Sequence, residues 1–270
     1  MVGLDLDGTL LNSEKKLTEY TKRIIQKALE QGCVVLVSTG RPITAVPKEV
    51  ISIPGMQYAV TTNGAQVLDL KSGKALFTNL IPIDVSKKVL EIFADYDALY
   101  EIFVDGRGYA KAECMERLSH YFEKPSSREY MRTTRTPVES VEETLAKFDE
   151  SLEKIHAIFH DMNERKEAIG RLLQIPEIVV ASSAPTDVEI NRKGTDKGMG
   201  LLRLGEMLGI QREEIMACGD EMNDYKMLQT VGFAVAMGNG VSEIKEIADY
   251  ITDTNDNDGV AKAIEKFVLK

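Results

Sequence analysis

Four short polar segments each follow an apolar run, and together they carry carboxylates, a hydroxyl, an amide and a cation. In chain order they contain Asp5 with Asp7, Thr39 with Arg41, Asn63 with Gly64, and Asp220 with Asn223 and Asp224. In open α/β sheets, ligands bind beyond the carboxyl ends of the strands. If the apolar runs are neighbouring strands, we expect the four segments to meet over one crevice.

Asp5 and Asp7 are two residues apart, a spacing that places both side chains on one side of an extended strand. Two buried carboxylates so close together repel unless a cation lies between them. An isolated pair of this kind is better explained by an Asx turn, in which each Asp accepts local backbone amides. The apolar residues on both sides, Val2–Leu4 and Leu10–Leu11, weaken that explanation because they indicate a buried segment.

Further carboxylates follow the apolar run at 215–218. Helix capping by Asp220 or Asn223 explains one acid there, but not three, and Glu221 is expected to be solvated. Together with Asp5 and Asp7, these side chains form a donor set of oxygens without histidine. Such a set prefers Mg²⁺ to zinc.

A phosphate-bearing ligand requires positive charge and hydrogen-bond donors. Lys197 opens a predicted helix whose N-terminus also presents free amides, and Lys193 is the alternative cation, although either lysine can simply be solvated. Thr39 and the backbone at Gly40 offer a hydroxyl and amides for phosphate oxygens, but Thr39 can equally be a helix cap. Arg41 either clamps the substrate or pairs with the acidic surface.

The apolar runs alternate with helical patterns at both ends of the chain. The predicted strands cover residues 2–6, 33–37, 58–60, 215–218 and 233–236, and the predicted helices cover 17–29, 196–208, 223–229, 241–248 and 259–267. Thr18 and Thr195 are the expected N-caps, and Gly32 is expected to end the first helix. Strands that are apolar on both faces are typical of a parallel sheet covered by helices.

The middle of the chain mixes strands and helices without this alternation. We expect a hairpin around Asp105-Gly106, helices at 86–95, 138–149 and 163–173, strands at 154–159, 178–181 and 187–190, and a polar loop at Thr133–Thr136. This pattern predicts an α+β domain, residues 83–189, inserted into an α/β domain formed by residues 1–82 and 190–270.

As a set, the polar segments resemble the four motifs of the haloacid dehalogenase (HAD) superfamily. The matching stretches are Asp5-Leu6-Asp7-Gly8-Thr9-Leu10, Ser38-Thr39-Gly40-Arg41, Thr62-Asn63-Gly64-Ala65, Lys197-Gly198, and Gly219-Asp220 with Asn223-Asp224. The position of the insert resembles the Cof-type branch with a type IIB cap, and the resemblance covers essentially the whole chain. It implies an α/β fold with a Rossmann-like, HAD-type parallel-sheet core and an inserted α+β cap.

The resemblance also implies residue roles for the first and last motifs. Asp5 would be the nucleophile, forming an aspartyl-phosphate, and Asp7 the general acid and base, so the two carboxyls need different environments. Mg²⁺ would be held by Asp5, the backbone carbonyl of Asp7, and Asp220. Asp224 would orient Lys197 or a metal-bound water.

The remaining motif residues are implied to bind the substrate. Thr39, Lys197 and Asn223 would hold the phosphoryl oxygens. The other residues assigned to substrate or phosphate binding are Leu6, Gly40, Arg41, Asn63 and Gly64.

Composition narrows the class of protein. The 270 residues include 33 Lys and Arg against 43 Asp and Glu, a formal net charge of −10, and 43% are hydrophobic. This is typical of a globular protein and argues against a nucleic-acid binder, which needs a basic face. Three scattered cysteines, no leader-like start and no run of about 18 apolar residues favour a cytoplasmic protein without a membrane partner.

The resemblance implies Mg²⁺-dependent hydrolysis of a phosphate ester, and small phosphorylated metabolites, above all sugar phosphates, would fit a cap that closes on the crevice. A sugar phosphomutase on the same scaffold is the alternative enzyme, and a non-catalytic phosphometabolite-binding protein is the alternative from another class. The presence of both Asp5 and Asp7 disfavours the non-catalytic binding protein. The oligomeric state, the physiological substrate and the cap residues that set specificity stay open.

Overall fold

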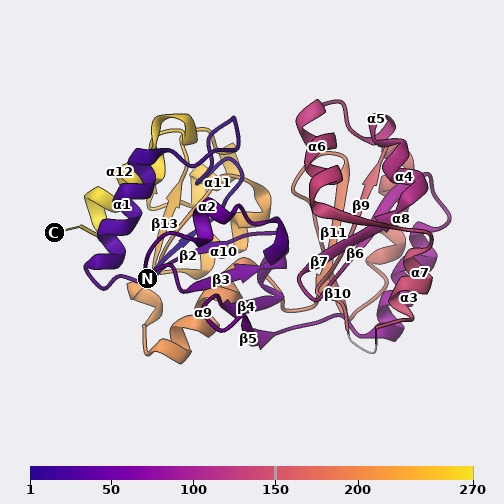
Figure 1. Cartoon of the computed structure of the whole chain (residues 1–270), viewed down its shortest axis with the longest axis horizontal. Coiled ribbons are helices and arrows are strands. Elements are labelled where there is room, and N and C mark those ends of the chain that lie inside the picture. Colours follow the sequence, from indigo (N-terminus) through magenta and orange to yellow (C-terminus); the bar gives the residue numbers. More distant parts are fainter. Residues whose placement is uncertain (149–150, 270) are drawn as a thin grey trace. The chain divides into compact units, whose positions relative to one another are not determined.

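The computed structural model describes residues 1–148 and 151–269, which form two compact units (Figure 1). Unit 1 consists of Met1–Arg41, Val46–Thr78 and Asp196–Lys270, and unit 2 of Pro42–Ala45 and Asn79–Thr195. The main crossings therefore lie at 78/79 and 195/196, whereas the sequence suggested 82/83 and 189/190. The boundary at 195/196 lies later than expected because the last strand of unit 2 continues to Arg192.

Unit 1 is built around an eight-stranded sheet. Its spatial order is β14 (Tyr250–Ile251), β13 (Phe233–Ala236), β12 (Met216–Gly219), β1 (Val2–Leu4), β2 (Val35–Ser38), β3 (Tyr58–Thr61), β4 (Gln66–Asp69) and β5 (Lys74–Thr78). All pairs from β14 to β3 are parallel, which confirms the predicted α/β fold with a parallel-sheet core. The antiparallel β4 and β5 were not predicted, because β5 is an exposed edge strand without a continuous apolar run.

The helices of unit 1 largely follow the predicted pattern. They are α1 (Glu19–Glu30), α2 (Lys48–Ile51), α9 (Lys197–Leu208), α10 (Tyr225–Thr230), α11 (Ser242–Ile247) and α12 (Gly259–Phe267). Thr18 caps α1 as expected, and Gly32 follows with a φ of 84°. The cap of α9 is Asp196, which accepts the amide of Met199, and not Thr195, whose hydroxyl is held by Asn79.

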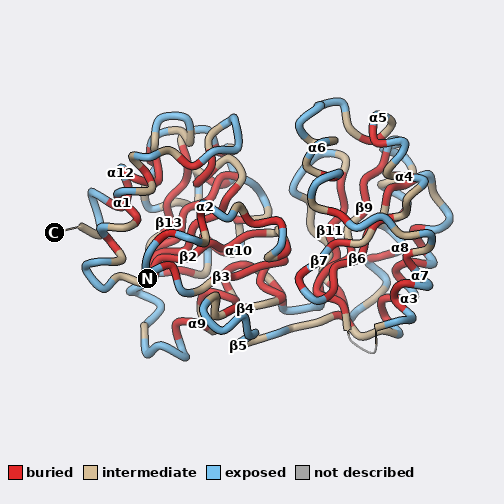
Figure 2. The backbone as a smooth tube through the Cα atoms, in the orientation of Figure 1, coloured by how far each residue is buried: buried red, intermediate tan, exposed pale blue. Residues whose placement is uncertain are grey.

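Small residues bring α9 close to the sheet. A Cβ on Gly3 of β1 would lie 2.5 Å from Leu201, and one on Gly200 would lie 2.5 Å from Val60 of β3. Apart from the edge strands β5 and β14, the strands and the inner faces of the helices are largely buried (Figure 2). This close packing places the first residue of α9 against the carboxyl ends of β1 and β2.

Unit 2 contains a six-stranded, mainly antiparallel sheet. Its order is β10 (Ile178–Ala181), β11 (Asp187–Arg192), β9 (Lys154–Phe159), β6 (Ala98–Val104), β7 (Arg107–Lys111) and β8 (Arg135–Val138). Its helices are α3 (Ile83–Phe93), α4 (Ala112–Glu116), α5 (Leu118–Tyr121), α6 (Pro125–Thr134), α7 (Val141–Leu145) and α8 (Met162–Leu172). One large apolar core contains residues of α3, α7, α8 and the sheet, and a smaller one contains residues of α4, α5 and α6.

Two predictions in the middle of the chain were wrong. Thr133–Thr136 is not a loop, because it spans the end of α6 and the start of β8. The helix expected at 138–149 is shortened to α7, and its last predicted residue lies outside the described residues. Among the described residues, no helix is long and apolar enough to cross a membrane.

Candidate active site

Three carboxylates converge at the ends of two neighbouring strands of unit 1. Asp5 follows β1, Asp220 follows β12, and the amide of Asp5 donates to Cys218 O across the pair at 3.1 Å. Asp224 ends the short 3₁₀ helix η4 (Met222–Asp224) that comes next. Each of the three buried side chains offers an oxygen within 4.8 Å of the others. The parallel register of β1 and β12 is what joins these segments, which are more than 200 residues apart in the chain.

Lys197, the first residue of α9, is the cation of this cluster. Its Nζ lies 2.7 Å from Asp5 Oδ1 and 2.6 Å from Asp224 Oδ1, and its side chain is completely buried. Burial would lower the pKa of Lys197, but the charges of Asp224 and Asp5 outweigh it and hold this pKa above its usual value. Lys193, the alternative cation, is exposed in unit 2.

One ammonium does not balance three buried carboxylates. Burial and the charge of Asp224 raise the pKa of Asp5 well above its usual value, despite Lys197. Burial, again with Asp224, raises the pKa of Asp220 to about 7. The donors are all oxygens, and their electrostatics favour an additional cation. A hard divalent ion such as Mg²⁺ therefore fits this cluster.

Asp7 lies in a different environment, paired with two cations. Arg41 Nε lies 2.7 Å from its Oδ2 and Arg41 Nη2 lies 2.6 Å from its Oδ1, while Lys15 Nζ is 2.7 Å from Oδ1. Burial alone would raise the pKa of Asp7, but Arg41 and Lys15 lower it to about 2. The pKa values of Asp5 and Asp7 therefore differ, but the higher one belongs to Asp5. An ionised nucleophile and a protonated general acid require the opposite order.

The Thr39 and Asn63 segments follow β2 and β3 and are tied to each other. The amide of Asn63 donates to Thr39 O at 3.0 Å, and the amide of Thr62 donates to Arg41 O at 3.0 Å. Thr39 Oγ1 accepts the amide of Arg41 at 3.2 Å. Gly64 has a φ of 96°, and a Cβ there would lie 2.1 Å from Asp196 O, so only glycine lets this loop approach the start of α9.

The other predicted site residues occupy less specific positions. Asn223 is half-buried in η4, beside Asp224. Leu6 is fully buried, so its backbone is the part available to a ligand. Gly40 is half-buried between Thr39 and Arg41, and Glu221 is exposed, as expected.

Sequence reasoning missed three residues that hold the acids or the loop that follows them. Thr9 Oγ1 donates to Asp220 Oδ1 at 2.8 Å, Lys15 pairs with Asp7, and Asn239 Nδ2 donates to Gly8 O at 2.8 Å. Thr9 belongs to the first motif, which was a usable signal for it. Lys15 and Asn239 carry no comparable local signal, because their roles depend on loop conformation.

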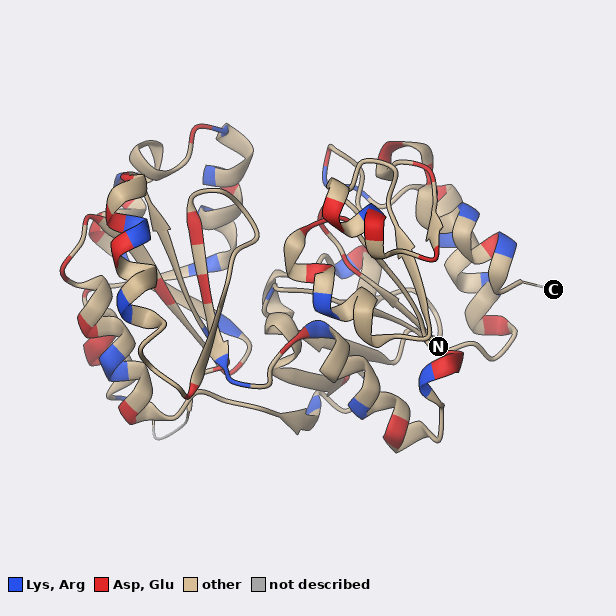
Figure 3. Cartoon of the chain, turned by 180° about the vertical axis from the view of Figure 1, so that it is seen from behind, with Lys and Arg blue, Asp and Glu red and all other residues tan. Residues whose placement is uncertain are grey.

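A second buried cluster lies on the sheet of unit 2. His156, Asp187 and Glu189 also offer ligand atoms within 4.8 Å of one another. This group already contains cations: Lys154 Nζ lies 2.8 Å from Glu189, and Arg135 pairs with Glu101, which also contacts His156 at 2.7 Å. In Figure 3 the ribbon of this sheet carries red segments at its acidic residues, and the helices beside it carry both red and blue segments. We interpret the cluster as an internally compensated ion-pair network.

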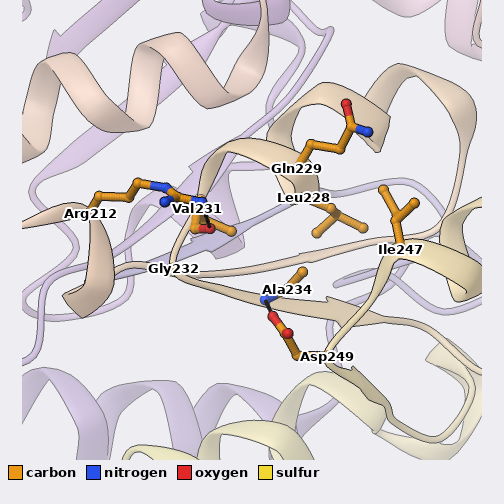
Figure 4. A pocket seen from close by; sticks show the side chains of 8 residues that line it. All are labelled: Arg212, Leu228, Gln229, Val231, Gly232, Ala234, Ile247 and Asp249. Atoms are coloured by element: carbon orange, nitrogen blue, oxygen red, sulfur yellow. Dashed lines mark hydrogen bonds between the residues drawn. The ribbon is translucent and has the colours of Figure 1, made fainter.

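Figure 4 shows a hollow in unit 1 that is lined by none of the three clustered acids. Its lining residues are Arg212, Leu228, Gln229, Val231, Gly232, Ala234, Ile247 and Asp249. Its two charged side chains are engaged locally, since Arg212 donates to Thr230 O at 2.6 Å and Asp249 accepts the amide of Ala234 at 2.8 Å. None of the predicted site residues lines it, and we assign it no role.

Comparison with known proteins identifies the family of this chain. A family model described as haloacid dehalogenase-like hydrolase matches residues 2–264. The chain belongs to this family. The resemblance inferred from the four motifs is thereby confirmed, as is the expected enzyme class, a phosphatase.

Two relatives from Bacillus subtilis strain 168 match along essentially their whole length. Both are named 5-amino-6-(5-phospho-D-ribitylamino)uracil phosphatase: YitU is 31% identical, with 99% of this chain and 97% of the relative covered, and YcsE is 29% identical, with 100% and 96% covered.

Solved structures agree with this placement. A haloacid dehalogenase-like hydrolase from B. subtilis superposes with a TM-score of 0.86 at 28% identity, covering 98% of this chain and 99% of that one. A hydrolase of the same description from Bacteroides thetaiotaomicron gives a TM-score of 0.83 at 26% identity, covering 98% of both. A HAD subclass IIB sugar phosphatase gives 0.81 at 22% identity, covering 100% and 99%, which shows a shared fold alone.

Proposed function

We propose that this HAD-family phosphatase is Mg²⁺-dependent and hydrolyses small phosphorylated metabolites through an aspartyl-phosphate on Asp5. The observation that carries the proposal is the convergence of Asp5, Asp220 and Asp224 around Lys197. The raised pKa values of Asp5 and Asp220 favour the binding of a cation beside them. Asp5, Asp220 and the backbone carbonyl of Asp7 would hold Mg²⁺, which when bound would neutralise charge between nucleophile and phosphate.

In the first half-reaction, a carboxylate oxygen of Asp5 attacks phosphorus and the bond to the leaving oxygen breaks. Lys197 holds Asp5 through Oδ1 and is itself oriented by Asp224. Lys197, Thr39 and Asn223 are the side chains we assign to the phosphoryl oxygens. The surroundings of the phosphoryl oxygens are completed by backbone groups or side chains of Leu6, Gly40, Asn63 and Gly64.

Asp7 completes the reaction as acid and base. It would give a proton to the leaving alkoxide and then take one from the water that hydrolyses the acyl-phosphate. Its low pKa in the free protein depends on Arg41 and Lys15. Asp7 can carry a proton only when Arg41 and Lys15 bind another anion in its place. The phosphate of a bound substrate is such an anion.

The substrate class we propose is a phosphomonoester on a polyhydroxylated chain, such as a sugar or sugar-alcohol phosphate. The named relatives support it, because their printed substrate carries its phosphate on a ribityl group. We assign selection of the leaving group to the inserted unit 2, as a cap. A cytoplasmic location is proposed as well, which the three unpaired cysteines favour.

The test is a panel of phosphorylated metabolites assayed for phosphate release in EDTA and after Mg²⁺ is restored. We expect release with Mg²⁺ alone, and none from the Asp5→Asn variant. Formation of an isomer without phosphate release would establish the mutase instead. Turnover that persists in EDTA would refute the metal role.

A further inference from the structure

The loop that follows Asp7 carries two side chains that act on the acids of unit 1. Residues 8–15, called the first-motif loop below, include Thr9, which donates to Asp220, and Lys15, which pairs with Asp7. Lys15 has a left-handed backbone, with a φ of 61°. The position of its ammonium therefore depends on the path of the whole loop, and not on the strand β1 alone.

Asn255 reaches this loop from the other end of the chain. It is the first residue of the 3₁₀ turn η5 (Asn255–Asn257), which lies between β14 and α12 in unit 1. Its side-chain Nδ2 donates to Leu11 O at 2.9 Å. Its backbone amide donates to Asn239 Oδ1 at 2.9 Å, and Asn239 Nδ2 donates to Gly8 O at 2.8 Å. One residue therefore holds two carbonyls of the first-motif loop, one directly and one through Asn239.

The amide of Asn255 fixes which way the Asn239 side chain is turned. A side-chain amide has an oxygen that accepts and a nitrogen that donates. Because the backbone N–H of Asn255 needs an acceptor, the oxygen of Asn239 must face it, and the nitrogen then faces Gly8 O. Gly8 O belongs to the peptide that joins Gly8 to Thr9, so this bond also fixes the point from which Thr9 reaches Asp220.

The turn that carries Asn255 has a fixed base in the sheet of unit 1. The amide of Thr252 donates to Ala236 O at 2.9 Å, and the amide of Gly238 donates to Asp253 O at 3.0 Å, so the chain before the turn is tied to the end of β13. A Cβ on Gly259, directly after Asp258, would lie 2.1 Å from Asp253 O, and glycine permits this close approach. The first-motif loop is therefore the part that the contact positions.

We propose that Asn255 is a positioning residue that holds the first-motif loop, and with it Lys15 and the carbonyl of Asp7, in place at the acids. Its role in the reaction rests on the proposed function, in which the Asp7 carbonyl is a ligand of Mg²⁺. The hold on the loop itself does not rest on that function, because Asn255 contacts the loop backbone. Removal of the Asn255 side chain should therefore affect metal binding and turnover more than substrate binding.

The variants remove the Asn255 donor in two ways. Asn255→Ala adds no charge, and Asn255→Asp keeps the size of the side chain. Asn257→Ala is the matched control, since Asn257 lies in the same turn, is exposed and donates within the turn, to Thr254 Oγ1 at 2.9 Å. Ser13, at the exposed tip of the loop, stays held by Asp256 in every variant, so the loop should loosen and not unfold. Melting by circular dichroism checks that each variant is folded.

Hydrogen exchange of the metal-free protein measures the loop directly. Several amides of the loop donate to backbone oxygens, which gives them measurable protection: Leu10, Leu11, Asn12 and Lys15. Loss of one hydrogen bond predicts about three- to ten-fold faster exchange over residues 8–15 in both Asn255 variants, and no change in Asn257→Ala. Exchange at the wild-type rate in Asn255→Ala would overturn the proposal, and so would acceleration confined to Asn255→Asp, which would trace to the added charge.

Two further measurements connect the loop to the reaction. Calorimetric titration with MgCl₂ should give an affinity about three- to ten-fold lower for Asn255→Ala than for wild type. With p-nitrophenyl phosphate and saturating Mg²⁺, kcat should fall by about the same factor, while KM stays within about two-fold, because the side chains assigned to the phosphoryl oxygens lie on other segments. A higher KM with an unchanged kcat would overturn the positioning role.

These readouts separate failure of the inference from failure of the proposed function. Faster exchange and weaker Mg²⁺ binding in Asn255→Ala, in a protein whose wild type releases no phosphate, would refute the proposed function and support the hold of Asn255 on the loop. A wild type that is an Mg²⁺-dependent phosphatase, with an Asn255→Ala variant that matches it in exchange rate and kcat, would refute the inference and support the function.

Discussion

Replacing Asp220 by Asn should stabilise the metal-free protein at alkaline pH, although it removes a proposed metal ligand. Burial and the charge of Asp224 raise the pKa of Asp220 from 3.8 to about 7. At about 1.4 kcal/mol per pH unit, ionising this side chain costs up to about 4 kcal/mol of folding free energy. Rearrangement of water and side chains reduces such costs, so we expect a gain of about 1–3 kcal/mol at pH 8.

The sign follows from proton linkage. Between pH 4 and 7 the folded protein binds the proton of Asp220 more tightly than the unfolded chain does, so its contribution to stability falls as pH rises. Below pH 4 Asp220 is protonated in both states, and the gain from Asn should be close to zero. At pH 5 the stability gained by the Asn substitution should lie between these limits and be smaller than at pH 8. Thr9 can still donate to the amide oxygen of Asn, so little else should change.

The assay is urea unfolding in EDTA at pH 5 and at pH 8, repeated with millimolar Mg²⁺. Mg²⁺ should stabilise the wild type through mass action and stabilise Asp220→Asn much less, so the order of the two proteins should reverse. Asp256→Asn, at an exposed acid, is the control and should not show this pattern. A metal-free Asp220→Asn protein that is less stable than wild type at pH 8 would show that Asp220 is not electrostatically strained.

Three further perturbations test the other charged groups. Asp5→Asn should abolish turnover and leave the fold intact by circular dichroism, and activity within ten-fold of wild type would exclude Asp5 as nucleophile. Lys197→Met should destabilise the metal-free protein by about 3 kcal/mol at pH 8, because Asp5 and Asp224 lose their buried partner; equal urea midpoints would contradict this. Arg41→Gln should raise the pKa of the Asp7 carboxyl from about 2 towards its usual value, as followed by ¹³C NMR; an unmoved titration would mean that Lys15 alone sets it.

Local pattern was enough to predict the architecture and where the acids gather. Apolar runs bounded by polar turns predict parallel strands, and the carboxyl ends of parallel strands lie at one edge of a sheet. The approach of Asp5 to Asp220 follows from that geometry, since β1 and β12 pair in register. Their carboxylates need no special loop to bring them together.

What the sequence alone determined, then, was the strands at the centre of the parallel sheet, the insertion and the residue types at the strand ends, because periodicity and turn chemistry are properties of short segments. The partners of Asp7, the exposed edge strand β5 and the contact of Asn255 with Leu11 were decided only by the tertiary structure. Each of these features depends on the conformation of a loop or on the edge of the sheet. The contacts there join residues that are distant in the sequence, and no local sequence pattern predicts them. The pKa values of Asp5 and Asp7 belong to the same class, since burial and neighbouring charge, not residue type, set them.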